Sequence, residues 1–155
     1  MTNKPVTEAL KKALADTYSL QLMTQNFHWN VEGPRFAELH VLFEGQYTEL
    51  FAAVDLIAER IRALGEKAPG TYNEFQKLRA ISDGDSSLDA DGMVRELYIA
   101  NHQLSKSLKE AAGVSEKAGD ISTTDLFTQR ITTHDKAAWM LKSTLPKEAR
   151  LKLAS

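Results

Sequence analysis

Residues 28–65 read HWNVEGPRFAELHVLFEGQYTELFAAVDLIAERIRALG. From about Arg35 to Leu64 the pattern is helical, and no proline or glycine pair interrupts it; only Gly45 weakens it. Gly33-Pro34 breaks the chain before this stretch, and Gly65 is placed to cap its end. The stretch therefore predicts one long helix that follows a turn.

Five residues of this stretch have side chains that bind metal ions: His28, His40, Glu44, Asp55 and Glu59. At 100° per residue, the last four fall within about 100° of one another around the helix, so they form a single stripe. His40 and Asp55 nevertheless lie about 22 Å apart along the helix axis, because each residue adds about 1.5 Å. One metal ion cannot span that distance. The helix thus carries a histidine half-site, His40/Glu44, and a carboxylate half-site, Asp55/Glu59.

A two-fold axis would complete both half-sites. If two copies of the helix pack antiparallel about a point near Tyr47 to Phe51, the histidine half-site of one chain faces the carboxylate half-site of the other. His28 precedes the turn, so a helix–turn–helix would bring it beside His40. The sequence therefore predicts two interface metal sites in each dimer.

The residues alone leave other interpretations open. Carboxylates one helical turn apart often form a solvated face or local salt bridges, here with Arg60 or Arg62, and histidines often pack or hydrogen-bond. The chain would then be a helical interaction module. As ligands, imidazoles with carboxylates suit iron, manganese or zinc, and a site with open positions favours redox chemistry over a closed structural role.

Composition narrows the class of protein. The 155 residues carry a net charge of −2 and include no cysteine, which excludes disulfide scaffolds and thiolate sites. No apolar run approaches the ~18 residues of a membrane span, and no secretory signal is evident. We expect a single soluble domain over residues 1–155, with short tails at both ends and a cytoplasmic location.

The remaining segments complete an all-α expectation. Helices are predicted over about 6–29, 90–112 and from Ser122 or Thr123 to just before Pro146, with a loop over 113–120. The connector over 66–91 is too long for a tight turn, and a short helix is expected within it at 72–81. Four long helices with one long connection predict a ferritin-like four-helix bundle with a short extra helix between the second and third.

Two stretches resemble the motifs of the Dps family, the mini-ferritins. They are His28-Trp29-Asn30-Val31-Glu32-Gly33-Pro34-Arg35-Phe36 running on to His40 and Glu44, and Val54-Asp55-Leu56-Ile57-Ala58-Glu59-Arg60-Ile61. The resemblance implies a ferroxidase that oxidises Fe(II), preferably with hydrogen peroxide, and stores ferric mineral in a hollow dodecamer, protecting DNA from oxidative damage. It assigns His28, His40, Asp55 and Glu59 as ferroxidase ligands, and Glu44 as a direct or water-mediated one.

Other residues receive secondary assignments. Trp29 is expected to pack, or to intercept a radical near the iron, and Arg60 to form a salt bridge that orients nearby carboxylates. The resemblance implies acidic pores, for which Asp120 and Asp125 are candidates, although helix capping explains them nearly as well. His102 and His134 are expected to be surface or packing residues. The chain has no Glu-x-x-His pair, which argues against a di-iron centre within one chain.

Direct DNA binding is the competing function. In that case the protein would associate with the nucleoid, and its iron chemistry would be secondary. Only about five residues precede the first helix, and they include one lysine, Lys4. The last stretch carries four basic residues, Lys142, Lys147, Arg150 and Lys152, against the acidic Glu148. In an oligomer, several such tails could bind DNA together, because avidity multiplies weak contacts. The acidic net charge and the salt sensitivity of phosphate contacts disfavour DNA binding without excluding it.

Overall fold

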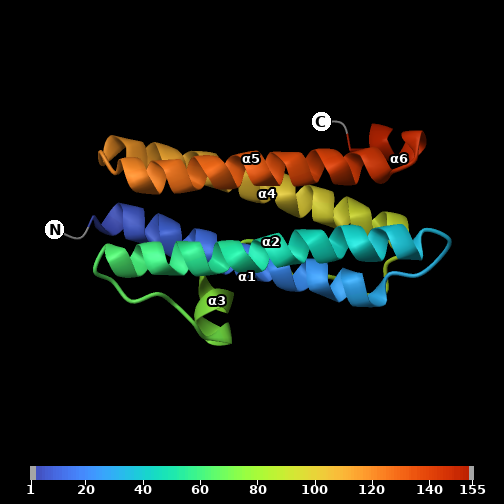
Figure 1. Ribbon diagram of the computed structural model, residues 1–155, viewed down its shortest axis with the longest axis horizontal. Helices are drawn as coiled ribbons and strands as arrows, with labels where there is room; N and C mark the ends of the chain where they lie inside the picture. The colour runs from blue at the N-terminus through green and yellow to red at the C-terminus, as the bar shows by residue number, and fades with distance from the viewer. Residues whose placement is uncertain (1–2, 154–155) are drawn as a thin grey trace.

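The computed structural model describes residues 3–153, which form six α-helices and no strand. The helices are α1 (Lys4–Asn30), α2 (Phe36–Ala63), α3 (Tyr72–Leu78), α4 (Ala90–Lys117), α5 (Ile121–Thr144) and α6 (Lys147–Leu151). Figure 1 shows α1 with α2 and α4 with α5 as two antiparallel hairpins that lie along each other, with α3 set to one side in the long connection. This four-helix bundle with a short extra helix confirms the predicted fold class.

The core lies along the axis of the bundle. Its fully buried members include Leu10, Leu14, Leu20, Phe27, Leu39, Phe43, Ile57, Ile61, Leu97, Phe127 and Leu141. They recur at three- and four-residue spacing, so each long helix turns one apolar stripe inward. Each such side chain contributes roughly 1.5–3 kcal/mol on burial, which holds the four helices in fixed register.

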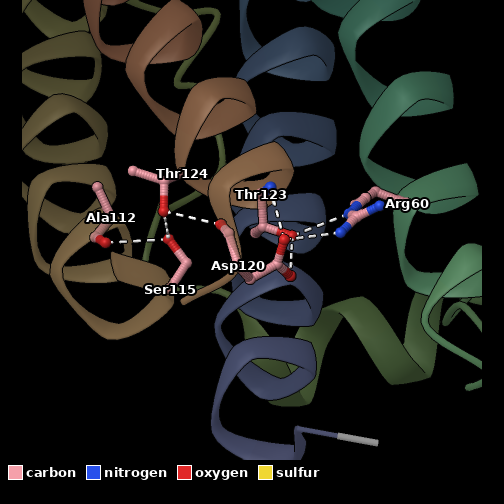
Figure 2. A network of polar contacts seen from close by, with 6 residues as sticks. All are labelled: Arg60, Ala112, Ser115, Asp120, Thr123 and Thr124. Atoms are coloured by element: carbon pink, nitrogen blue, oxygen red, sulfur yellow. Dashed lines mark hydrogen bonds and ion pairs between the residues drawn. The ribbon is translucent and has the colours of Figure 1, made fainter. Parts of the chain in front are cut away.

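The corner between α4 and α5 differs from the sequence expectation. The predicted loop over 113–120 was wrong over most of its length, because α4 continues through Gly113 to Lys117 and ends before Gly119, whose φ is +72°. The cap of α5 is Asp120, not Ser122 or Thr123, and its side chain accepts a hydrogen bond from the Thr123 backbone N–H. Figure 2 shows how Ser115 and Thr124 link the two helices at this corner.

The long connector is held against α1. The Asp16 carboxylate is almost fully buried and accepts the backbone N–H groups of Ala80, at 2.6 Å, and Ile81, at 3.0 Å. On α3 the Phe75 ring stacks on Tyr18, with 4.8 Å between ring centroids. These contacts fix the connector as it crosses from one hairpin to the other.

Two further findings concern the long helices and the chain's end. Within residues 3–153, no helix is both long and apolar enough to cross a membrane.

After Pro146 the chain forms α6, a short helix that the sequence pattern did not predict. The Arg35 guanidinium donates to the Thr144 carbonyl at 2.6 Å, which ties the start of α2 to the end of α5.

Candidate metal centre

His28 and His40 lie side by side at the turn between α1 and α2. Gly33, with a φ of +109°, lets the chain reverse tightly there, a conformation that residues with a Cβ rarely adopt. The two imidazole rings stack with 3.7 Å between centroids and 14° between planes. His28 is buried and His40 is half-buried. The structure therefore brings together the two histidines that the sequence singled out.

Reciprocal hydrogen bonds fix the orientation of both rings. His28 Nδ1 lies 2.7 Å from the His40 carbonyl oxygen, and His40 Nδ1 lies 2.7 Å from the His28 carbonyl oxygen. A carbonyl oxygen can only accept, so each Nδ1 carries the proton that it donates. In a neutral imidazole the lone pair is then on Nε2, the tautomer that metal-ligating histidines commonly adopt through such a backbone contact. Both residues fit a metal ion through Nε2.

Two further aromatic rings contact the pair. Phe36, one turn before His40 on α2, lies with its ring centroid 5.0 Å from that of His40. Tyr47 meets the His28 ring edge-on, with 5.1 Å between centroids and 72° between planes. The role of Phe36 was missed from the sequence, although its spacing of four residues before His40 was a sufficient signal.

The three carboxylates lie on the exposed surface of α2. Glu44, Asp55 and Glu59 are all exposed, and within residues 3–153 no three His, Asp or Glu side chains gather closely enough to hold a metal ion. Between the two half-sites lies an apolar side chain open to solvent, Phe51, at 66% exposure. One chain therefore joins the two imidazoles but not the carboxylates.

Arg60 points from α2 towards the start of α5, as Figure 2 shows. Its Nη2 lies 2.7 Å from Asp120 Oδ1, and its Nε donates to Thr123 Oγ1 at 2.9 Å. Burial alone would raise the pKa of Asp120, but hydrogen bonds from Thr123 and the charge of Arg60 outweigh burial and lower that pKa below its usual range. Arg60 thus forms its salt bridge with Asp120 across the bundle, and within residues 3–153 no ion pair joins it to Asp55 or Glu59, whose orientation it was expected to fix.

The two acidic pore candidates have different surroundings. Asp120 caps α5 and forms a salt bridge with Arg60. Asp125, by contrast, is exposed and accepts a hydrogen bond from Gln129 at 2.7 Å. These contacts match the capping interpretation of Asp120. The assignment of the pair to an iron entrance stays a prediction.

His134 and His102 have the surroundings of packing and surface residues. His134 is buried, with Nδ1 2.9 Å from Asn101 Oδ1 and Nε2 3.2 Å from Arg130 Nη2. Burial, together with the charge of Arg130, lowers the pKa of His134 to about 3, so the ring is neutral near pH 7. His102 is exposed and stacks on Tyr98, with 6.1 Å between ring centroids.

Comparison with known proteins identifies the family. The ferritin-like domain family matches residues 7–151. A protein named DNA protection during starvation protein 2 from Bacillus anthracis is 37% identical over 143 residues, which span 92% of this chain and 98% of that one. The X-ray structure of Dps from Thermosynechococcus elongatus superposes with a TM-score of 0.91 at 31% identity, covering 94% of this chain and 93% of that chain.

The chain belongs to the Dps family. Its bundle is the ferritin-like fold, as the sequence motifs indicated. A Dps structure from Vibrio cholerae, described as a member of a broad superfamily of ferritin-like diiron-carboxylate proteins, is 28% identical with a TM-score of 0.88 and covers 92% of this chain and 90% of that chain. The described helices of this Dps protein therefore share the architecture of that ferritin-like structure.

Proposed function

We propose that this Dps protein is a ferroxidase that stores and detoxifies iron, oxidising Fe(II) preferably with hydrogen peroxide. The observation that carries the proposal is the His28–His40 pair, whose Nδ1 atoms are both bound to backbone carbonyls so that both Nε2 atoms can bind a metal. Family membership supports iron as the substrate. Imidazole and carboxylate donors together suit iron in both oxidation states.

The iron site is proposed to lie between two copies of the chain. His28 and His40, with Glu44 directly or through water, would bind Fe(II) from one subunit, and Asp55 and Glu59 would bind it from the partner. The exposed apolar residue Phe51 is placed to pack between the half-sites, where burial would also exclude water.

The reaction consumes peroxide without releasing a radical. Two Fe(II) ions give one electron each to hydrogen peroxide, and the O–O bond breaks. Together with two water molecules, the two Fe(II) ions and the peroxide give two units of ferric oxyhydroxide and four protons. The chain's part is to hold the irons on fixed imidazole and carboxylate donors, and to leave positions open for peroxide.

Storage and protection follow from the assembly we propose. A hollow dodecamer built from such dimers, in the cytoplasm, would retain the ferric mineral and keep Fe(II) away from peroxide in solution. DNA is then protected from oxidative damage without direct contact.

The test follows iron and protein mass together. Fe(II) is added anaerobically to the purified protein, hydrogen peroxide follows, and ferric absorbance is recorded with the particle mass. Rapid oxidation with iron retained in a particle of about twelve chains is expected. Oxidation no faster than in protein-free buffer would contradict the proposal.

One observation favours DNA binding as a second function. Lys147, Arg150 and Lys152 are exposed beyond α5, so their charges are free to meet phosphates. A gel-shift with linear duplex DNA at graded salt separates the two functions, because strong retardation at physiological salt would favour the DNA-binding one.

A further inference from the structure

A cavity of about 360 Å³ lies between α2 and α5, a volume within the range of small-molecule sites. Most of its wall is apolar, formed by Val41, Leu42, Leu50, Ala137 and Met140. Gln46 and Glu49, which also line it, lie about 120° and 180° around α2 from His40. The cavity is therefore separate from the stripe of proposed iron ligands.

Gly45 contributes to the room in this cavity. It lies in the wall and inside α2, where a glycine weakens the helix relative to alanine. A Cβ built on Gly45 would have no atom within 4 Å. The wall thus has space at a position where most residues would supply a side chain.

The side-chain amide of Gln46 is the distinctive polar group of the wall. Its Oε1 and Nε2 are both buried, and within residues 3–153 neither atom has a hydrogen-bond partner. Buried polar groups in folded proteins are almost always paired, because an unpaired one keeps the full cost of its lost hydration. Gln46 therefore presents an acceptor and a donor, side by side, to a molecule in the cavity.

The other polar groups of the wall are already paired or lie in solvent. Asn101 Oδ1 is 2.9 Å from Nδ1 of His134, whose buried ring is neutral near pH 7. Both carboxylate oxygens of Glu49 accept hydrogen bonds from Arg130. Lys136 is exposed at the rim. No charge in the wall is left without a partner inside the cavity, so a charged ligand would lose its hydration without a counter-ion.

We propose that this cavity binds an uncharged, largely apolar ring compound whose amide presents its N–H and C=O on the same side. The N–H would donate to Gln46 Oε1, and the C=O would accept from Gln46 Nε2, which pairs both buried atoms. An open-chain secondary amide is trans and points these two groups in opposite directions. Lactams and primary aryl carboxamides have the required edge, and their rings suit the aliphatic wall.

The experiment follows a methyl group of the cavity wall. The assembled protein, carrying ¹³C at its methionine methyl groups, is titrated with the lactam 2-quinolone, with benzamide and with N-methyl-2-quinolone. Met140 lines the cavity whereas Met23 and Met93 are buried in the core, so the Met140 resonance should shift while the other two stay in place. 2-Quinolone should bind about tenfold or more tightly than its N-methyl derivative, which leaves Gln46 Oε1 unpaired.

Three variants test the role of the amide. Gln46→Leu keeps the bulk but not the polar atoms, so it should weaken 2-quinolone binding about tenfold and bind both quinolones equally. Unchanged Met23 and Met93 resonances would show that its fold is intact. Gln103→Leu, at an exposed position on α4, should bind as the wild type does. Gly45→Leu should fill the cavity and prevent binding of all three compounds.

The outcomes separate the two parts of the proposal. Wild-type affinity in Gln46→Leu, or equal affinity of the wild type for the two quinolones, would overturn the pairing with Gln46. A Met140 resonance that none of the compounds shifts would overturn the binding site itself. The tighter binder of 2-quinolone and benzamide identifies whether a lactam or a primary carboxamide is preferred, and either preference supports the proposal.

Discussion

The imidazoles of His28 and His40 each hydrogen-bond the backbone carbonyl of the other residue, at 2.7 Å in both directions. The two contacts close a ring across the α1–α2 turn, so neither side chain can rotate without breaking the bond made by its Nδ1. The same bonds leave both Nε2 atoms as the ligating atoms. Structural support and preparation for metal binding are thus provided by the same two contacts.

Replacing His40 should abolish iron oxidation while the protein still assembles. His40→Ala removes one proposed ligand and leaves the His28 carbonyl without its partner, which costs about 1–3 kcal/mol of stability. Ferric absorbance after peroxide addition should fall to the protein-free rate, and particle mass should be unchanged. His102→Ala is the matched control, since His102 is exposed on α4. Wild-type oxidation by His40→Ala would show that the pair is structural.

His134 should make the folded protein sensitive to acid. Its pKa is lowered from 6.5 to about 3 by burial and by Arg130, so between these pH values the unfolded chain binds a proton that the folded chain does not. The unfolding free energy should therefore fall as pH drops below 6.5, by up to about 1.4 kcal/mol for each pH unit.

Denaturant unfolding at several pH values and fixed protein concentration measures this slope. His134→Gln should flatten the slope between pH 4 and 6, because the amide does not titrate, whereas His102→Gln should leave it unchanged. An equal slope in His134→Gln and the wild type would assign the acid sensitivity to other groups.

Replacing each of the two aspartates near the start of α5 should have different effects on the stability of the protein. Asp120→Ala removes the helix cap and the partner of Arg60, so a loss of about 1–3 kcal/mol is expected. Asp125→Ala, at an exposed position, should stay within about 0.5 kcal/mol. The lowered pKa of Asp120 adds stability above the pKa of the unfolded carboxyl, and that stability is lost as pH falls.

The same two variants test the iron entrance. If both aspartates guide Fe(II) into the shell, both variants should slow mineral formation at equal site occupancy. If neither variant takes up iron more slowly than the wild type, the two aspartates do not line the pore, and Asp120 acts only as a helix cap.

Replacing two of the glycines by alanine should change the stability of the protein in opposite directions. A Cβ on Gly84 would lie 3.0 Å from Met23 Cγ and 3.1 Å from Phe27 Cε1, so Gly84→Ala should cost about 1–3 kcal/mol through overpacking against α1. Gly45 is inside α2 with nothing within 4 Å of such a Cβ, and Gly45→Ala should stabilise by about 0.5–1 kcal/mol. Thermal unfolding of both variants checks the signs, and two variants of equal stability would contradict the packing argument.

The sequence predicted what depends on local pattern. The bounds of α2 followed from uninterrupted helical spacing and from Gly65, and the turn at Gly33-Pro34 placed His28 near His40. Gly113 misled the prediction of α4, because a glycine inside a helix costs only about 1 kcal/mol and tertiary packing around Ser115 overrides that cost.

The contacts between distant segments could not be predicted. No spacing rule pairs Arg60 with Asp120 or Arg130 with Glu49, because these ion pairs depend on how α5 docks on α2. The reciprocal bonds between His28 and His40 likewise need the geometry of the turn. The proposed joining of the carboxylates to this pair depends on a second chain, which a single sequence indicates only through the stripe on α2.

The most direct test of the interface site combines two inactive variants. His28→Ala and Asp55→Ala chains carrying different affinity tags are co-expressed, and particles that contain both are purified in two steps. If the site takes histidines from one chain and carboxylates from the other, each mixed dimer regains one intact site, and random pairing should restore roughly a quarter of wild-type ferroxidase sites. Mixed particles as inactive as each variant alone would show that all ligands come from one chain.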